Sequence, residues 1–205
     1  MPSSRFQGRV EKLELARGHD GLLRGPPDPV LAIAVYVGDG STFRILGRSL
    51  HRFEPRKPFP SDALPDVHEL PAGAIDSASP FRFVVLAVAI EEDGGVDVQR
   101  IYGALEHHRM LAVWSPEHQE MEQLALSAIP DSPTWATPAQ VDLLIEGIPL
   151  TQSCTSDKLI GAVCWTMSSR ADSMPTFPHR PSLFRLPFLS ADRKNDWTAL
   201  LSIAH

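Results

Sequence analysis

The sequence predicts a mainly β protein, an antiparallel sandwich of about eight strands interrupted by three short helices. Three observations lead to this fold class. Apolar, β-branched runs at residues 30–37, 81–90 and 159–167 are typical of buried strands. Between residues 97 and 148 the apolar spacing changes to a helical period. The 19 prolines cluster mainly between these runs. Proline lacks a backbone donor, so such clusters mark loops and strand edges.

The N-terminal part predicts a strand followed by a hairpin. Residues 10–15 alternate weakly and form the first strand. Residues 30–37 are almost entirely apolar, which indicates a strand buried on both faces. The glycine-rich residues 38–41 form a turn, and residues 43–50 return as the hairpin partner. After the proline-rich connection at residues 56–65, we expect the remaining strands at residues 67–75, 81–90, 159–167, 183–189 and 197–203.

Three helix starts are predicted in the central part. Asp97 can cap a helix whose apolar residues Val98, Ile101, Tyr102 and Leu105 recur at helical spacing. Ser115 followed by proline and glutamate is a second start. Thr137 and Gln140 have the spacing of a capping box and mark the third. The helices together fill residues 97–148.

Composition excludes several classes of protein. A net charge of −6 without a basic stretch argues against a nucleic-acid partner. No apolar run approaches the roughly 20 residues that span a bilayer, and residues 1–5 lack the apolar core of a signal peptide. We therefore expect a cytoplasmic protein. Its two cysteines, Cys154 and Cys164, are too few for a disulfide framework, and Cys164 is expected to be buried in a strand.

The order of these segments resembles a C2 domain, an antiparallel sandwich of eight strands with acidic loops at one end. Residues 13–18 resemble the first strand and its exit, and Asp20 followed by Asp28-Pro29-Val30 resembles the first acidic loop. Residues 83–93 resemble the strand that leads into the third acidic loop. Asp157 and Ile160-Gly161 resemble the return from that loop.

The resemblance implies one domain, with residues 8–93 and 155–205 forming the sandwich and residues 97–148 inserted in its third loop. Ile90 and Leu159 would then end and begin neighbouring strands of one sheet. The sequence departs from the family here, because the third loop of family members is short. It departs again at Lys158, where the family has a carboxylate, and at Glu91, where it has aspartate.

The resemblance also implies a candidate calcium site. Calcium takes about six to eight oxygen ligands. Five acidic side chains would gather at the loop end: Asp20, Asp28, Glu91, Asp93 and Asp157. Such carboxylates repel one another unless a cation neutralises them. Lys158 is an alternative cation supplied by the chain itself, and in that case the loop end is salt-bridged and needs no metal.

Three functions follow from this reading. The first is a non-catalytic C2-like module, and not an enzyme, that binds a protein partner or another copy of itself. Trp114 and Trp135 are either its exposed anchors or residues that pack the insertion onto the sandwich. The second is calcium-dependent binding of anionic phospholipid membranes.

The third is a hydrolase of unfamiliar fold. Its nucleophile would be Cys154, with His51, His68 or His179 as the base. The adjacent pair His107-His108 is better read as exposed, because neighbouring helical residues point in different directions.

Overall fold

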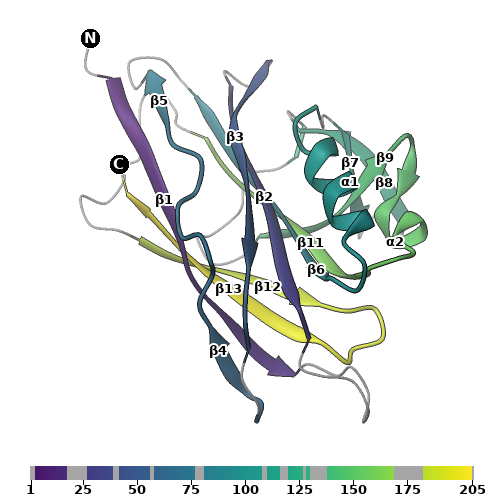
Figure 1. Ribbon diagram of the computed structural model, residues 1–205. Coiled ribbons are helices and arrows are strands. Elements are labelled where there is room, and N and C mark those ends of the chain that lie inside the picture. Colours follow the sequence, from purple (N-terminus) through teal and green to yellow (C-terminus); the bar gives the residue numbers. More distant parts are fainter. Residues whose placement is uncertain are drawn as a thin grey trace.

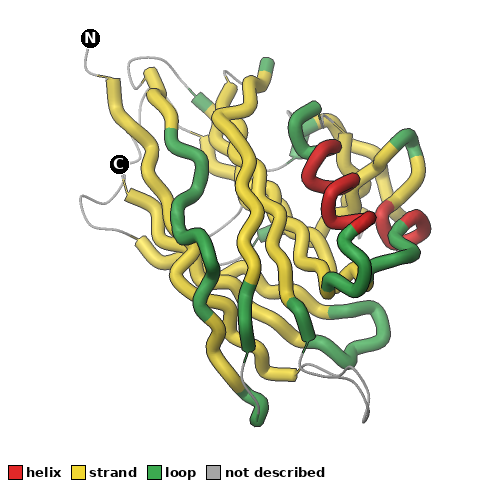
Figure 2. The backbone as a smooth tube through the Cα atoms, viewed as in Figure 1, coloured by secondary structure: helices red, strands yellow, loops and turns green. Residues whose placement is uncertain are grey.

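The computed structural model consists of two antiparallel β-sheets with two short helices beside the larger one (Figures 1 and 2). It describes residues 3–17, 27–38, 42–55, 58–76, 81–107, 110–115, 120–126, 128–129, 138–168 and 182–204. This confirms the predicted mainly antiparallel β class. Within those ranges, no helix is long and apolar enough to cross a bilayer.

The smaller sheet has the order β12-β13-β1-β4, and β5 also pairs with β1. Its strands are β1 (Ser3–Arg17), β4 (Ser61–Ala63), β5 (Gly73–Asp76), β12 (Ser182–Leu189) and β13 (Asp196–Ala204). The larger sheet has the order β3-β2-β6-β11-β9-β7-β8, and β10 pairs with β9. Its strands are β2 (Pro29–Gly38), β3 (Phe43–Arg52), β6 (Arg82–Glu91), β7 (Met110–Ser115), β8 (Glu120–Ala125), β9 (Ala139–Ile145), β10 (Ile148–Pro149) and β11 (Lys158–Ser168).

The main core lies between the two sheets. Alternate residues of β2, β6 and β11 face inward and meet the inner face of β1, β12 and β13. Trp165 of β11 and Trp197 of β13 are both buried there. Trp165 packs against Phe184 of β12 with ring centroids 5.0 Å apart, so an aromatic pair joins the two sheets.

A second core lies on the outer face of the larger sheet. Helix α1 (Val96–Ala104) packs Val98 and Ile101 against the outward-facing residues of β2 and β6. Strands β2 and β6 are therefore buried on both faces, as the unbroken apolar run of β2 predicts. Residues of β7 and β9 belong to the same apolar cluster, so the far part of the sheet also encloses the helix.

Strands β3 and β2 hold the C-terminal end of α1. The Tyr36 hydroxyl donates to the carbonyl of Leu105, and the Arg48 guanidinium donates to the carbonyls of Tyr102 and Gly103. The Arg48 guanidinium carbon also lies 4.4 Å from the centroid of the Tyr102 ring. A cation at the carbonyl end of a helix interacts favourably with its dipole, so β3 supplies the basic side chain that the last turn of α1 lacks.

The strand order confirms the predicted neighbours across the insertion. Leu159 pairs directly with Ile90, and the ladder continues from Gly161 opposite Ala89 after a bulge. Strand β9, within the predicted insertion, pairs with β11 from the other side, with Val141 opposite Ala162. The insertion therefore extends the larger sheet.

The helical content predicted for residues 97–148 is wrong in two of three places. The first helix is present as α1, but the chain forms strands β7 and β8 around Ser115 and strand β9 after Thr137. A second short helix, α2 (Leu150–Ser153), follows where none was expected. The apolar runs here are short, and helix and strand periods are hard to separate in such runs. Sheet pairing decides the outcome through tertiary contacts, because β9 pairs with β11, β7 with β9, and β8 with β7. The described residues contain thirteen strands instead of about eight.

Residues 66–71, here named the strap, join the edges of the two sheets. The strap lies between β4 and β5 and runs alongside β1 (Figure 1). The Asp66 N–H donates to the carbonyl of Arg52 in β3 at 2.9 Å. The Val10 N–H of β1 donates to the carbonyl of His68 at 2.7 Å, and the Leu70 N–H donates to the carbonyl of Gly8 at 2.9 Å.

The strap lies so close to β3 that it requires a glycine there. A methyl group on Gly47 would lie 2.7 Å from Cβ of Pro71. We expect Gly47→Ala to displace the strap and lower the free energy of unfolding by about 1–3 kcal/mol. As a control, a methyl on Gly103 of α1 meets nothing within 4 Å, so Gly103→Ala should stabilise the protein by about 0.5–1 kcal/mol. Chemical denaturation measures both, and a Gly47→Ala variant as stable as wild type would contradict the close approach.

Candidate functional site

Four of the five predicted acidic residues lie at one end of the larger sheet, here named the loop end. Glu91 at the end of β6 pairs with Pro29 of β2 on one side and with Lys158 of β11 on the other. Asp28 stands beside Glu92, whose N–H donates to the Asp28 carbonyl at 2.9 Å. Sheet register thus brings Asp28, Glu91 and the start of β11 to the same end. Asp20 lies outside the described residues.

Asp157 binds the loop that follows β6. Its Oδ1 accepts the N–H groups of Asp93, Gly94 and Gly95 at 3.0, 2.7 and 2.8 Å. Its Oδ2 accepts the N–H of Val98 in the first turn of α1 at 3.1 Å. Gly95 has a φ of 75°, a left-handed conformation that favours glycine, and this curls the backbone around the carboxylate. Asp157 therefore caps α1 from a distant part of the chain.

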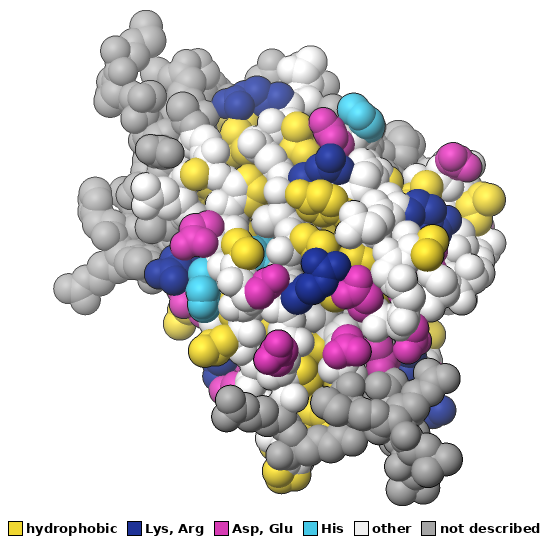
Figure 3. All heavy atoms as spheres, viewed as in Figure 1, with side chains coloured by type: hydrophobic (Ala, Val, Ile, Leu, Met, Phe, Trp, Pro, Cys, Tyr) yellow, Lys and Arg dark blue, Asp and Glu magenta, His cyan; other side chains and the backbone are white. Residues whose placement is uncertain are grey.

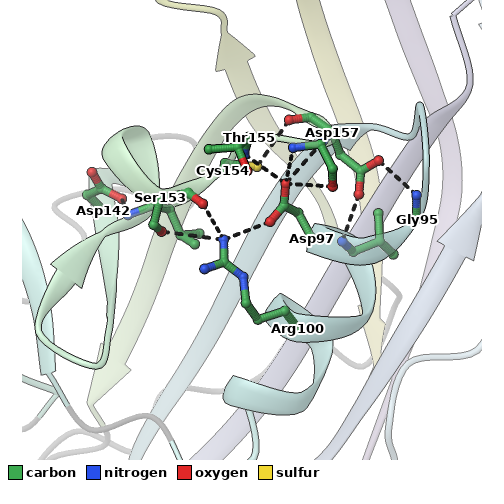
Figure 4. Close-up of polar contacts among 11 residues, drawn as sticks. Gly95, Asp97, Arg100, Asp142, Ser153, Cys154, Thr155 and Asp157 are labelled. Carbon is green, nitrogen blue, oxygen red and sulfur yellow. Dashed lines mark hydrogen bonds and ion pairs between the residues drawn. The ribbon is translucent and has the colours of Figure 1, made fainter.

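Asp97 makes the reciprocal contact from the first turn of α1. Its Oδ2 accepts the N–H groups of Thr155, Ser156 and Asp157 at 2.9, 2.7 and 3.1 Å, as well as the Ser156 hydroxyl at 2.9 Å. Figure 4 shows the two carboxylates side by side. The Asp157 carboxylate binds backbone near Asp97, and the Asp97 carboxylate binds backbone at and before Asp157. The loop after β6 and the loop before β11 are thus tied together twice.

Arg100 completes this cluster from the next turn of α1. Its guanidinium donates to Asp97 Oδ1 at 2.8 Å and to the carbonyl of Ser153 at 2.7 Å, at the end of α2 (Figure 4). Asp142 of β9 receives the Leu150 N–H at 2.9 Å and the Thr151 hydroxyl at 2.6 Å, and so fixes the other end of α2. Each short element at the loop end is held by a charged side chain from another element.

These contacts set the charge of the two buried aspartates. Burial alone would raise the pKa of Asp157, but the N–H donors from Gly94, Gly95, Val98 and Asp93 outweigh it and the pKa is lowered. The pKa of Asp97 is also lowered, because donors from Ser156, Asp157 and Thr155 outweigh its burial. Both groups are therefore carboxylates at neutral pH. The predicted role of Asp97 as the cap of its own helix is wrong, because Gly95 occupies the N-cap and Asp97 lies within the first turn. That position in the sequence gives no sign of a distant partner.

Lys158 lies between two acidic side chains at the loop end. Glu91 is buried, and its Oε2 lies 3.9 Å from Lys158 Nζ, which is also 3.3 Å from Asp192. Asn195 donates to the same Glu91 oxygen at 3.4 Å. Hydrogen bonds from Ser190 and from the Lys194 N–H lower the pKa of Asp192 to about 2. The loop end is thus salt-bridged by the chain's own lysine.

The candidate calcium ligands are only partly assembled. Within the described residues, no group of three or more His, Cys, Asp or Glu side chains is placed to hold a metal. Asp157, the central candidate, already accepts four backbone N–H groups, whereas Asp28 and Asp93 are exposed. A site here would need Asp157 to exchange these donors for the ion. The calcium ligand set stays a prediction.

Cys154 lies beside the two aspartates. Its thiol donates to the Asp157 carbonyl at 3.2 Å. Burial and the negative charge of Asp97 raise its pKa to about 12. A nucleophilic cysteine needs a lowered pKa instead. The candidate bases have other partners. His51 contacts the Ser49 hydroxyl and the Val67 carbonyl, and His68 contacts the Val10 carbonyl.

The other residues singled out in the sequence lie elsewhere. Cys164 is buried in β11, as predicted. His107 is exposed, and His108 is outside the described residues. Trp114 falls in β7, a strand instead of a helix boundary, and its side chain is not described. Trp135 and His179 also lie outside the described residues.

The surface of the loop end is an open hollow. It is lined by Asp93, Thr151, Cys154, Thr155, Ser156, Asp157, Lys158, Leu159 and Ala191. Most of these residues belong to the loop and strand start around Asp157, and Ala191 comes from the loop between β12 and β13. The hollow therefore has a backbone fixed by the two aspartates and a rim of small polar side chains.

Replacing the Asp157 carboxylate tests its structural role. We expect Asp157→Asn to lower the free energy of unfolding by about 3 kcal/mol, because one amide oxygen cannot accept four N–H groups. Asp93→Asn is the matched control, since Asp93 is exposed in the same loop, and should change stability by less than about 0.5 kcal/mol. Because the pKa of Asp157 is lower in the folded than in the unfolded chain, its carboxylate stabilises the fold fully above the unfolded pKa of about 3.9. The difference between Asp157→Asn and wild type should therefore shrink as the pH falls from that value through the native pKa. Equal stability of Asp157→Asn and Asp93→Asn at pH 7 would refute the capping role of Asp157.

No protein-family model matches the sequence, and no curated protein or solved structure does either. The resemblance to C2 domains therefore stays a prediction.

Proposed function

We propose that the chain is a non-catalytic, C2-like interaction module that binds a protein partner, or a second copy of itself, through its loop end. The observation that carries this proposal is the exchange of hydrogen bonds between Asp97 and Asp157. Both buried carboxylates hold loop backbone in place, so the surface that the two loops form is ordered before any partner binds. A surface that is already ordered loses less conformational entropy on binding.

The chemistry of the hollow supports a protein partner. Thr155 and Ala191 on its rim are exposed, and Lys158 and Asp93 place both charge signs beside them. Acidic and basic side chains are also interspersed over the face drawn in Figure 3. Mixed charge with small polar groups suits the polar rim of a protein interface better than a phosphate backbone.

Two observations weigh against the alternatives. The raised pKa of Cys154 opposes a Cys-His hydrolase at this position. Calcium-dependent binding of anionic phospholipid would require Asp157 to release its N–H donors. A calcium site would also raise the unfolding midpoint by mass action, so an equal midpoint in calcium and in chelator favours the protein-binding module.

An arginine on the rim tests the proposal. Thr155 is exposed and contributes only its N–H to Asp97, so Thr155→Arg should leave the fold intact while blocking the hollow. We expect this variant to lose at least tenfold in the recovery of copurifying protein, or in self-association measured by sedimentation.

Gln123→Arg on β8 is the matched control, because it adds the same charge at an exposed position that does not line the hollow. It should behave as wild type. Loss of binding in both variants, or in neither, would reject the loop end as the docking site.

A further inference from the structure

The loop between β12 and β13 presents two basic side chains beside the hollow. Ala191 of this loop lines the hollow, and Asp192 lies 3.3 Å from Lys158 at the start of β11. Arg193 and Lys194 follow, and both are exposed. Neither side chain has an ion-pair partner among the described residues. This side of the loop end therefore carries positive charge that the chain itself does not neutralise.

Hydrogen bonds within the loop hold these two residues in place. The Ser190 hydroxyl donates to Asp192 at 2.5 Å and accepts the Asn195 N–H at 3.0 Å. The Lys194 N–H donates to Asp192 at 3.1 Å, and the Arg193 N–H donates to the Ser190 carbonyl at 2.8 Å. Arg193 has a φ of 56°, in the left-handed region that residues other than glycine adopt rarely. Backbone strain that is held in this way is found most often at functional sites.

The opposite side of the loop end is acidic. Asp28 precedes β2 and Glu54 follows β3, so both lie on the far side of β6 from β11. They are exposed, and together with Glu92 and Arg52 they line a second hollow. Glu92 neutralises Arg52 through two hydrogen bonds of 3.0 Å. Glu54 has no partner among the described residues, so this side stays negatively charged.

Exposed apolar side chains border the same surface. Val96 is 66% exposed and follows Gly95, whose N–H is bound by Asp157. Leu189 is 49% exposed at the end of β12, where the loop with the basic pair begins. Apolar side chains that are exposed beside a hollow can be buried when a partner covers it, and this burial is favourable. The surface thus offers apolar contact area in addition to its two charged sides.

The separation of the two charges favours a second copy of the chain as the partner. A partner of one charge sign would be attracted by one side and repelled by the other. A two-fold axis that crosses the hollow places the acidic side of each copy against the basic side of the other, because both copies present the same surface. Opposite charges then meet twice in one interface, whereas the net charge of −6 makes the copies repel one another elsewhere.

We infer that the chain forms a symmetric dimer through its loop end, in which the acidic side of each copy faces Arg193 and Lys194 of the other across the hollow. This rests on the proposed function, because it assigns a second copy to the same docking surface. Single exposed ion pairs contribute little to affinity. We therefore expect a dimer with a dissociation constant in the micromolar range, to which Val96 and Leu189 add apolar contact.

Sedimentation velocity of the full chain at about 5 to 500 µM tests the inference. Wild type should change from monomer to dimer over this range. Glu54→Lys and Lys194→Glu should each weaken the dimer at least about tenfold, because every reversal acts at both symmetric contacts. Neither substitution removes an ion pair within the described residues, so both variants should fold as wild type does.

The combined variant assigns the contact. In Glu54→Lys with Lys194→Glu the two signs are exchanged, so opposite charges face one another again and the affinity should return to within about threefold of wild type. Glu120→Lys on β8 is the matched control. It makes the same change of net charge at an exposed residue that lines neither hollow, and it should dimerise as wild type does.

A wild-type protein that stays monomeric over the whole range would overturn the inference. Single reversals that dimerise as wild type does, or a combined variant that does not recover, would overturn it equally. These outcomes differ from a failure of the proposed function. A different protein that copurifies with wild type and Gln123→Arg but is lost in Thr155→Arg would still support docking at the loop end.

Discussion

The loop end depends on one interaction, the exchange of backbone hydrogen bonds between Asp97 and Asp157. Asp157 binds the loop just before Asp97, and Asp97 binds the loop just before Asp157. Neither loop can therefore move without the other. The arrangement satisfies the Val98 N–H in the first turn of α1, which would otherwise have no intrahelical acceptor. It also converts two buried charges, which would be costly if unpaired, into fixed joints between β6, α1 and β11.

This joint explains how a sandwich accommodates an insertion between two neighbouring strands. Ile90 and Leu159 are paired, yet the chain leaves the sheet between them and returns. The inserted segment packs against the sheet at two places. Helix α1 covers the outer face of β2 and β6, and strand β9 pairs with β11. Arg48 holds the far end of α1 while Asp157 holds the near end. Burial on both faces of β2 and β6 is the result.

The sequence predicts the strands well and the insertion poorly, for physical reasons. Runs such as residues 30–37 and 81–90 are long, apolar and β-branched, so one pattern fits them. The segments around Leu124 and Val141 are short, and sheet pairing determines their structure. The gathering of Asp28, Glu91 and Asp157 at one end was predictable from strand order. The role of Asp97 was not, because its partners are backbone N–H groups brought near only by folding.

The strap and the loop end illustrate two uses of buried ionisable groups. Asp97 and Asp157 are held charged by backbone donors, whereas His51 is held neutral by burial. The most direct test of the account is a double-mutant cycle with Asp97→Ala and Asp157→Ala, measured by denaturant unfolding. If the two carboxylates form one joint, the double variant should lose about 1–3 kcal/mol less than the sum of the single losses. Additive losses would show two independent caps and contradict the shared joint.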